Sequence, residues 1–181
     1  DTADGLILAS PVYVNDVNGV AKNWMDRLAY VCHRPAFASK CAYLVATVAD
    51  SPTRHTLRTM NVGLRTWGFH IVGQAGYKMG ALMPQAEVES RYQGEAAKIA
   101  QALFQAVSQQ QFLRPSFLSL MMFKIQQGAW QGEDPDSFDY AYWEEKGWFD
   151  PRYEFYIAHR ANRVKVALAR LVGAVLAKFV T

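Results

Sequence analysis

The stretch from Ala3 to Leu28 constrains the fold of this 181-residue chain more than any other. It opens with a short, continuous apolar run at Gly5–Ala9, passes through a polar loop at Ser10–Asn18 and continues with helical spacing from Gly19 to Cys32. A continuous apolar run followed by a helix is typical of a strand that is buried on both faces of a parallel sheet. The stretch therefore predicts an α/β fold.

Ligands of such sheets bind at the carboxyl ends of the strands. The loop Ser10–Asn18 is therefore the first candidate for a functional site. Asn18 is expected to cap the following helix, because its side chain can accept a hydrogen bond from a free helix N–H. Four apolar residues at helical spacing are expected to pack this helix on the sheet: Val20, Trp24, Leu28 and Val31.

Two further strand–helix pairs follow along the chain. Strands are expected at Lys40–Ala49 and Phe69–Ala75, and helices at about Thr53–Trp67 and Gln85–Gln111. The apolar faces expected for the two helices are Leu57, Met60, Leu64 and Trp67, and Ile99, Leu103, Phe104 and Val107. The predicted fold class is α/β, a three-layer parallel sheet of about three strands in residues 1–111.

Residues 112–181 differ in character and are predicted to form a helical, aromatic-rich C-terminal extension. An apolar helix is expected at Pro115–Ala129. The segment Tyr140–Phe149 is dense in aromatic residues. We interpret these aromatics as holding the extension to its core or to another subunit; stacking on a bound ring is the alternative.

The last predicted helix, Ala161–Phe179, is amphipathic, and its basic residues flank the apolar stripe. Packing against a second subunit is favoured, because Gly173 and several alanines permit close helix contact. Peripheral contact of residues 161–181 with an anionic membrane surface is the alternative. The apolar stripe consists of Val164, Leu168, Leu171, Val172, Val175 and Phe179.

Composition limits the function classes. A net charge of +3 does not argue for a nucleic-acid partner, and the two cysteines, Cys32 and Cys41, have neither metal-ligand nor disulfide spacing. We interpret them as reduced thiols in a cytoplasmic protein. No signal peptide or membrane-spanning run is expected. No hydrolase, metalloprotease or nucleotide-loop motif is present, so the sequence predicts neither catalytic side chains nor a metal site.

The first stretch resembles a known family. The residues Ala3-Asp4-Gly5-Leu-Ile-Leu-Ala-Ser10-Pro11-Val12-Tyr13, with Gly19, Lys22, Asp26 and Arg27, are similar to the third-strand segment of flavodoxin-like NADPH-dependent FMN reductases. The resemblance implies FMN as cofactor, NADPH or NADH as co-substrate, and hydride transfer from the nicotinamide to the flavin and on to an acceptor.

The resemblance also implies which residues contact the flavin. Backbone groups of Pro11, Val12, Val14 and Asn15, together with Ser10, would border the ring edge, and Tyr13 would lie against or beside the ring. Asp50 and Ser51 would form a second wall, although Asp and Pro stand where the family usually has glycines.

In the family, two strands and a phosphate-binding loop precede this segment, and we expect both to be missing from these residues. Gly5–Ala9 would then have an unpaired edge, so we expect another chain, a swapped strand or a further segment to cover it. A homo-oligomer is accordingly expected. The alternative function is a cofactor-free remnant or interaction module that acts through oligomerisation.

Overall fold

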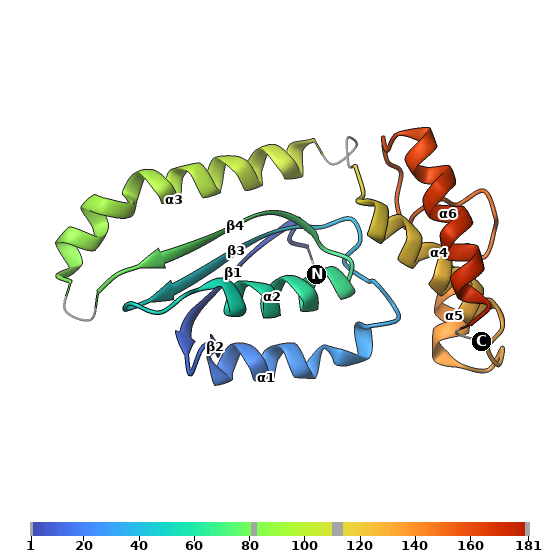
Figure 1. The fold of residues 1–181 in the computed structure, drawn as a ribbon, viewed down its shortest axis with the longest axis horizontal. Coiled ribbons are helices and arrows are strands. Elements are labelled where there is room, and N and C mark those ends of the chain that lie inside the picture. The colour runs from blue at the N-terminus through green and yellow to red at the C-terminus, as the bar shows by residue number, and fades with distance from the viewer. Residues whose placement is uncertain (1, 81–82, 110–113, 180–181) are drawn as a thin grey trace. The chain divides into compact units, whose positions relative to one another are not determined.

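The computed structural model describes residues 2–80, 83–109 and 114–179 (Figure 1). The chain divides into two compact units, Asp1–Ser108 and Gln109–Thr181, and each is described by itself. The boundary expected between residues 111 and 112 lies outside the described residues, so its position stays a prediction.

The N-terminal unit is built on a four-stranded sheet in the order β2-β1-β3-β4. Strands β1 (Gly5–Tyr13), β3 (Cys41–Val48) and β4 (His70–Lys78) run parallel, and the two-residue β2 (Asp16–Val17) pairs antiparallel with β1. The predicted α/β class with a parallel sheet is confirmed, with one short strand more than expected.

Strand β3 has neighbours on both sides and is the most deeply buried strand of the described sheet. Its apolar run therefore faces helices on both sides. Helices α1 (Gly19–Arg27) and α2 (Arg54–Thr66) cover one face, and α3 (Gln85–Ser108) covers the other (Figure 1). The apolar face predicted for α2 is confirmed, because Leu57, Met60, Leu64 and Trp67 are all buried.

The face predicted for the first helix is wrong at two of its four residues. Ala21 and Met25 are buried in α1, whereas Val20 is 82% exposed and Trp24 is 38% exposed. The other two residues are confirmed, because Val31 is buried in the core and Leu28 packs against it. Met25 packs against α2 so closely that a Cβ on Gly63 would lie 2.5 Å from its Cε. The helix also ends at Arg27 rather than Cys32, and a short 3-10 turn, η1 (Ala29–Val31), follows it.

Helix α3 differs from its predicted face at one position. Ile99 is buried, and the side chains of Leu103 and Val107 lie 3.3–3.4 Å from a Cβ placed on Gly5, against the sheet. Phe104, however, is 71% exposed. Adjacent residues on a helix point about 100° apart, so Leu103 and Phe104 do not both face the same sheet.

The far edge of β1 is unpaired along most of its length. Its residues Gly5–Pro11 bond to β3 on one side, while β2 reaches only Val12 and Tyr13 on the other. No described residue extends the sheet beside Gly5–Pro11. The expected cover is therefore not supplied by the described part of the chain, and it stays a prediction.

The C-terminal unit is helical, with α4 (Phe117–Gln131), α5 (Phe138–Glu145) and α6 (Arg163–Ala177). The aromatic residues singled out in the sequence form the core of this unit. Phe123, Trp143 and Trp148 are buried, and the ring centroids of the two tryptophans lie 5.2 Å apart. The aromatic segment thus holds the extension together internally.

Helices α4 and α6 pack closely because small residues meet at their contact. A Cβ on Gly173 would lie 2.8 Å from both the Cβ of Lys124 and the carbonyl oxygen of Met121, and one on Gly128 would lie 2.9 Å from the Cβ of Ala177. The close contact expected at Gly173 is therefore made within the chain. The opposite, apolar side of α6 remains exposed, including Val164, Leu168, Leu171, Val172, Val175 and Phe179.

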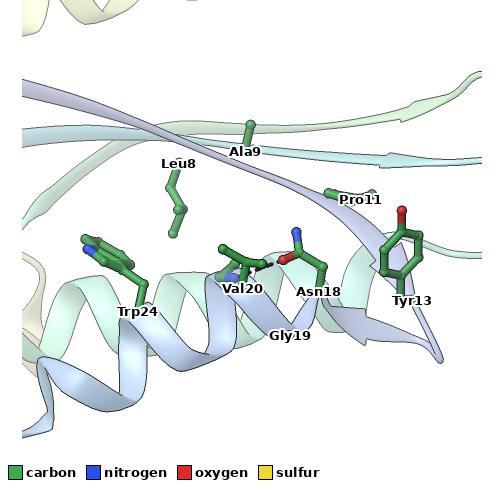
Figure 2. Close-up of a pocket in the computed structure, with 9 residues that line it drawn as sticks. Leu8, Ala9, Pro11, Tyr13, Asn18, Gly19, Val20 and Trp24 are labelled. Atoms are coloured by element: carbon green, nitrogen blue, oxygen red, sulfur yellow. Dashed lines mark hydrogen bonds between the residues drawn. The ribbon is translucent and has the colours of Figure 1, made fainter.

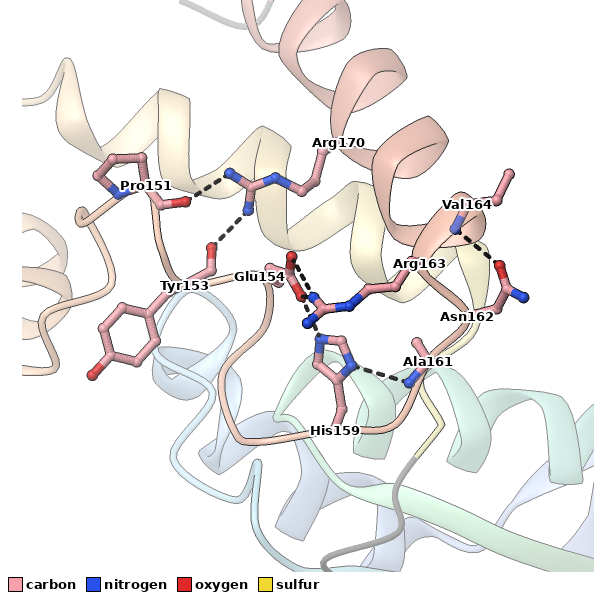
Figure 3. A network of polar contacts seen from close by, with 9 residues as sticks. All are labelled: Pro151, Tyr153, Glu154, His159, Ala161, Asn162, Arg163, Val164 and Arg170. Carbon is pink, nitrogen blue, oxygen red and sulfur yellow. Dashed lines mark hydrogen bonds and ion pairs between the residues drawn. The ribbon is translucent and has the colours of Figure 1, made fainter.

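The loop between α5 and α6 is held by α6 itself. The Arg170 guanidinium donates hydrogen bonds to the carbonyl oxygens of Tyr153 at 2.7 Å and Pro151 at 2.8 Å, and Arg163 pairs with Glu154 at 3.1 Å (Figure 3).

Within the described residues, no helix combines the length and the apolar character that crossing a bilayer requires.

Candidate functional site

The segment predicted as a loop at Ser10–Asn18 is mostly a β-hairpin. Ser10–Tyr13 continue β1, Val14 and Asn15 form the turn, and Asp16–Val17 return as β2. Pro11 is compatible with a strand because β1 lies at the unpaired edge, where no ladder bond is lost. The turn was not predicted, because two-residue hairpin turns usually contain glycine and this one does not.

The turn requires an unusual backbone conformation. Val14 and Asn15 have φ values of 49° and 67°, and the Val14 side chain is fully exposed. Asparagine tolerates this left-handed region, but for a β-branched residue it costs roughly 1–3 kcal/mol. Strain of this kind persists only where neighbouring contacts hold the backbone, and it occurs most often at ligand sites.

One end of the hairpin is closed by Ser10 and Asn18. The Ser10 hydroxyl is buried, donates to the Pro11 carbonyl oxygen at 2.8 Å and accepts bonds from Asn18. The Asn18 side chain in turn accepts from the backbone N–H of Ala21 at 2.9 Å, which confirms it as the N-cap of α1. Strand end, hairpin and helix start are therefore joined by one hydrogen-bonded group.

An open hollow of about 790 Å³ lies beside this group, between the unpaired edge of β1 and α1 (Figure 2). Its volume falls within the range of small-molecule sites. Pro11, Tyr13 and Asn18 line it near the hairpin, and Leu8 and Trp24 line it farther along the strand. Its wall is predominantly apolar, as a flat aromatic ligand requires.

The predicted site residues therefore divide into groups. Pro11 and Tyr13 line the hollow, and Tyr13 is 63% exposed. Ser10 and Val12 instead support the hairpin from inside: Ser10 is buried and Val12 packs on the core. Val14 and Asn15 are exposed at the turn and are absent from the described lining of the hollow.

Asp50 and Ser51 follow β3 at the same edge of the sheet. Both are exposed, and neither is among the described residues that line the hollow. The Asp50 carboxylate instead lies 3.4 Å from Lys78 Nζ, at the end of β4. Asp50 and Ser51, predicted to form the second wall of the site, thus lie at the same edge of the sheet but are not among the described residues that line the hollow.

Sequence reasoning missed a contact between the hairpin and α2. His55 Nε2 lies 3.5 Å from the Asp16 carboxylate, and the Thr59 side chain also hydrogen-bonds to Asp16. No local spacing in the sequence indicates this pair, because 39 positions separate the two residues. The predicted topology could have indicated the contact. Both residues follow the carboxyl end of a parallel strand, and such ends lie at the same edge of the sheet.

The electrostatics of Asp16 follow from these contacts. Partial burial disfavours its ionised form. The Val17 backbone N–H at 2.8 Å, the Thr59 side chain and His55 together outweigh this effect and hold the pKa of Asp16 below its usual value. Asp16 is therefore an anion at neutral pH, with partners from both its own strand and α2.

Metal-ligating groups do not gather anywhere in the described residues. Within 2–80, 83–109 and 114–179, no three His, Cys, Asp or Glu side chains lie close enough to hold a metal ion. Cys32 is half-buried, Cys41 is buried, and burial raises the pKa of the Cys41 thiol. An iron–sulfur cluster takes four thiolate ligands, so the two cysteines of this sequence do not fit one.

The fold is that of a flavodoxin-like α/β protein. It combines a parallel sheet, a hairpin that presents an aromatic side chain at the strand ends, and an apolar hollow beside that hairpin. Residues 1–81 match the family model described as NADPH-dependent FMN reductase. The N-terminal part of the chain is therefore similar to this family over residues 1–81.

A relative gives a second, more distant match. An iron-sulfur flavoprotein from Archaeoglobus fulgidus is 26% identical over 149 residues, which is 81% of this chain and 66% of that protein. The chain thus spans less than two thirds of the relative's length, by a narrow margin. The match extends beyond residues 1–81, into the part of the chain that the family model does not cover.

Proposed function

We propose that the N-terminal unit binds FMN beside the β1–β2 hairpin and acts as an NAD(P)H-dependent oxidoreductase. The observation that supports this most is the position of Tyr13, exposed at the carboxyl end of β1 and lining an apolar hollow. The family match over residues 1–81 supports the choice of a flavin over other flat ligands.

The residues fit the ring of the cofactor. Tyr13 offers an aromatic face, and Pro11 and Trp24 offer apolar walls. The backbone groups of the Val14–Asn15 turn are exposed and available to polar atoms at the ring edge. When bound, the flavin would supply the hydride chemistry, while this chain binds and orients it and keeps water from one side of it.

The co-substrate is proposed to be a nicotinamide nucleotide, as the family's description implies. An acceptor that reaches the ring requires an open site, and the exposed hairpin leaves the hollow accessible from solvent. We propose no acid or base from the chain for hydride transfer, which needs none at the protein.

Titration with FMN tests the proposal. We expect the parent protein to bind FMN with a visible shift of the flavin absorption band. Replacing Tyr13 by Ala is expected to weaken binding about tenfold, the order expected for loss of an aromatic contact. Tyr30→Ala is the matched control, because Tyr30 is 65% exposed and lies outside the described lining.

The outcomes separate two functions. Equal affinities for parent, Tyr13→Ala and Tyr30→Ala would remove Tyr13 from the site. A parent protein without any flavin affinity would favour the second candidate, a cofactor-free interaction module. The unpaired edge of β1 favours that candidate, since free strand edges recruit other chains.

A further inference from the structure

The hairpin that carries Tyr13 is too short to hold its own shape. Strand β2 pairs with β1 through only two residue pairs, Val12↔Val17 and Tyr13↔Asp16. The turn between them places Val14 at a φ of 49° without packing its side chain. A two-stranded hairpin is marginally stable in water even when longer and unstrained. Contacts from elsewhere in the fold must therefore hold it.

One set of these contacts comes from one face of α2. His55 and Thr59 are four positions apart, so their side chains lie one above the other on the helix. His55 Nε2 lies 3.5 Å from Asp16 Oδ2, and the Thr59 side chain hydrogen-bonds to the same carboxylate. Asp16 Oδ1 also accepts from the Val17 N–H at 2.8 Å. One carboxylate thus joins the hairpin to the helix.

The anchored residue is the cross-strand partner of Tyr13. Tyr13 and Asp16 flank the two-residue turn and face each other in the ladder. Fixing Asp16 therefore fixes both the strained turn and the direction in which Tyr13 leaves β1. The opposite end of the hairpin is already closed by Ser10 and Asn18.

We propose that His55 and Thr59 are positioning residues, which hold Asp16 and thereby keep the hairpin in the conformation that presents Tyr13 to a flat ligand. The effect on FMN rests on the proposed function; the anchoring of the hairpin does not. Neither residue lines the described hollow, so each acts through Asp16.

The test measures hairpin order and FMN affinity separately. Amide hydrogen exchange of residues 12–17 is compared with that of β3 in the ligand-free protein, for the parent, His55→Gln, Thr59→Val and the double variant. Thr66→Val is the matched control, because Thr66 lies on the same helix and bonds only to the Val62 carbonyl oxygen among the described contacts. FMN dissociation constants and urea midpoints are measured on the same proteins.

Half-exposed polar contacts are weak, so His55→Gln is expected to accelerate exchange in the hairpin about two- to fivefold, with FMN affinity falling by a similar factor. The double variant is expected to show about tenfold changes, with exchange in β3 and the urea midpoint close to those of the parent. His55→Arg, which keeps an N–H donor facing Asp16, is expected to recover much of both losses.

Each outcome decides a separate point. Hairpin exchange equal to that of the parent in the double variant would overturn the anchoring. Faster exchange with unchanged FMN affinity would overturn the positioning role. Faster exchange in a protein whose parent does not bind FMN would uphold the anchoring and overturn the proposed function alone.

Discussion

The hydroxyl oxygen of Ser10 accepts hydrogen bonds from both the backbone N–H and the side-chain amide of Asn18, at 3.0 and 3.1 Å. Ser10 is 1% exposed, so no water can replace it. These bonds join Ser10, within β1, to Asn18, the N-cap of α1. They also set the spacing between Pro11 and the first turn of α1, which both line the hollow.

Replacing Ser10 by Ala is therefore expected to destabilise the N-terminal unit by about 1–3 kcal/mol, because the part-buried Asn18 N–H would lose its acceptor. Urea unfolding followed by circular dichroism measures this change. Ser90→Ala, an exposed serine in α3, is the control and is expected to leave stability nearly unchanged. Equal midpoints for both variants would mean that the Ser10–Asn18 contact adds nothing to stability.

The Gly173 contact makes a prediction for the C-terminal unit. Gly173→Ala is expected to destabilise this unit by roughly 1–3 kcal/mol, because the new methyl group would lie 2.8 Å from Met121 O and the Lys124 Cβ. Gly94→Ala in α3 meets nothing within 4 Å and is expected to stabilise the other unit by about 0.5–1 kcal/mol. Thermal unfolding of both variants tests the pair; a stabilising Gly173→Ala would show that α4 and α6 are not in close contact.

His159 predicts how the C-terminal unit responds to acid. Its side chain is 7% exposed, its Nδ1 accepts from the Ala161 N–H at 3.2 Å, and its Nε2 lies 3.7 Å from Glu154 (Figure 3). Burial lowers the pKa of His159; Glu154 opposes this effect, and Arg163 adds to it. The folded protein therefore binds this proton less readily than the unfolded chain.

Stability from this group is complete above about pH 6.5, the unfolded-state value, and is lost as the pH falls through the lower folded-state pKa. We expect the unit to lose at most about 1.4 kcal/mol per pH unit from this proton. Unfolding followed by near-ultraviolet circular dichroism of the buried tryptophans, between pH 7.5 and 5, measures the loss. The same slope in His159→Gln would assign it to other groups.

The exposed side of α6 predicts self-association. Its apolar stripe, which includes Leu168 and Leu171, is open, while Arg170 and Lys165 donate to backbone carbonyl oxygens and Arg163 pairs with Glu154. Because these cations are engaged within the unit, protein packing is favoured over an anionic membrane surface. We expect sedimentation velocity to show an oligomer that Leu171→Glu reduces to a smaller species.

Two results would contradict this expectation. If the parent protein sediments as a monomer at the same concentrations, the predicted self-association is wrong. Co-sedimentation of that monomer with anionic vesicles, lost in Leu171→Glu, would instead support the peripheral membrane alternative for residues 161–181. Neutral vesicles are the control, because charge attraction does not contribute to binding them.

The sequence predicted those parts of the fold in which the burial of a strand or helix follows from its own pattern of apolar residues. The apolar run of β3 and the face of α2 are long and regular, so their burial followed from periodicity. The face of α1 was wrong because Val20 and Trp24 line the hollow beside the open edge of β1 rather than the core. A pattern gives the spacing of apolar residues but not which of two neighbouring surfaces they meet.

The site was predictable to a similar degree. Pro11 and Tyr13, which line the hollow, lie in the segment Ser10–Asn18 that was singled out because it follows an apolar run; that run is an edge strand and is less buried than expected, with Ile7 49% exposed. The His55–Asp16 contact was not predicted, because it depends on how two strand ends are brought together. The turn at Val14–Asn15 was missed because two-residue hairpin turns usually contain glycine, whereas these two residues have positive φ values without one.

The one-sided bonding of β1 also has a mechanical consequence. Among the described strands of the parallel core, β3 is held on both sides, whereas Gly5–Pro11 is held on β3 alone. A pulling force applied at the amino end would load this single ladder and peel β1 away residue by residue, starting from Gly5. The hairpin with Tyr13, at the far end of the strand, would be the last part of β1 to detach.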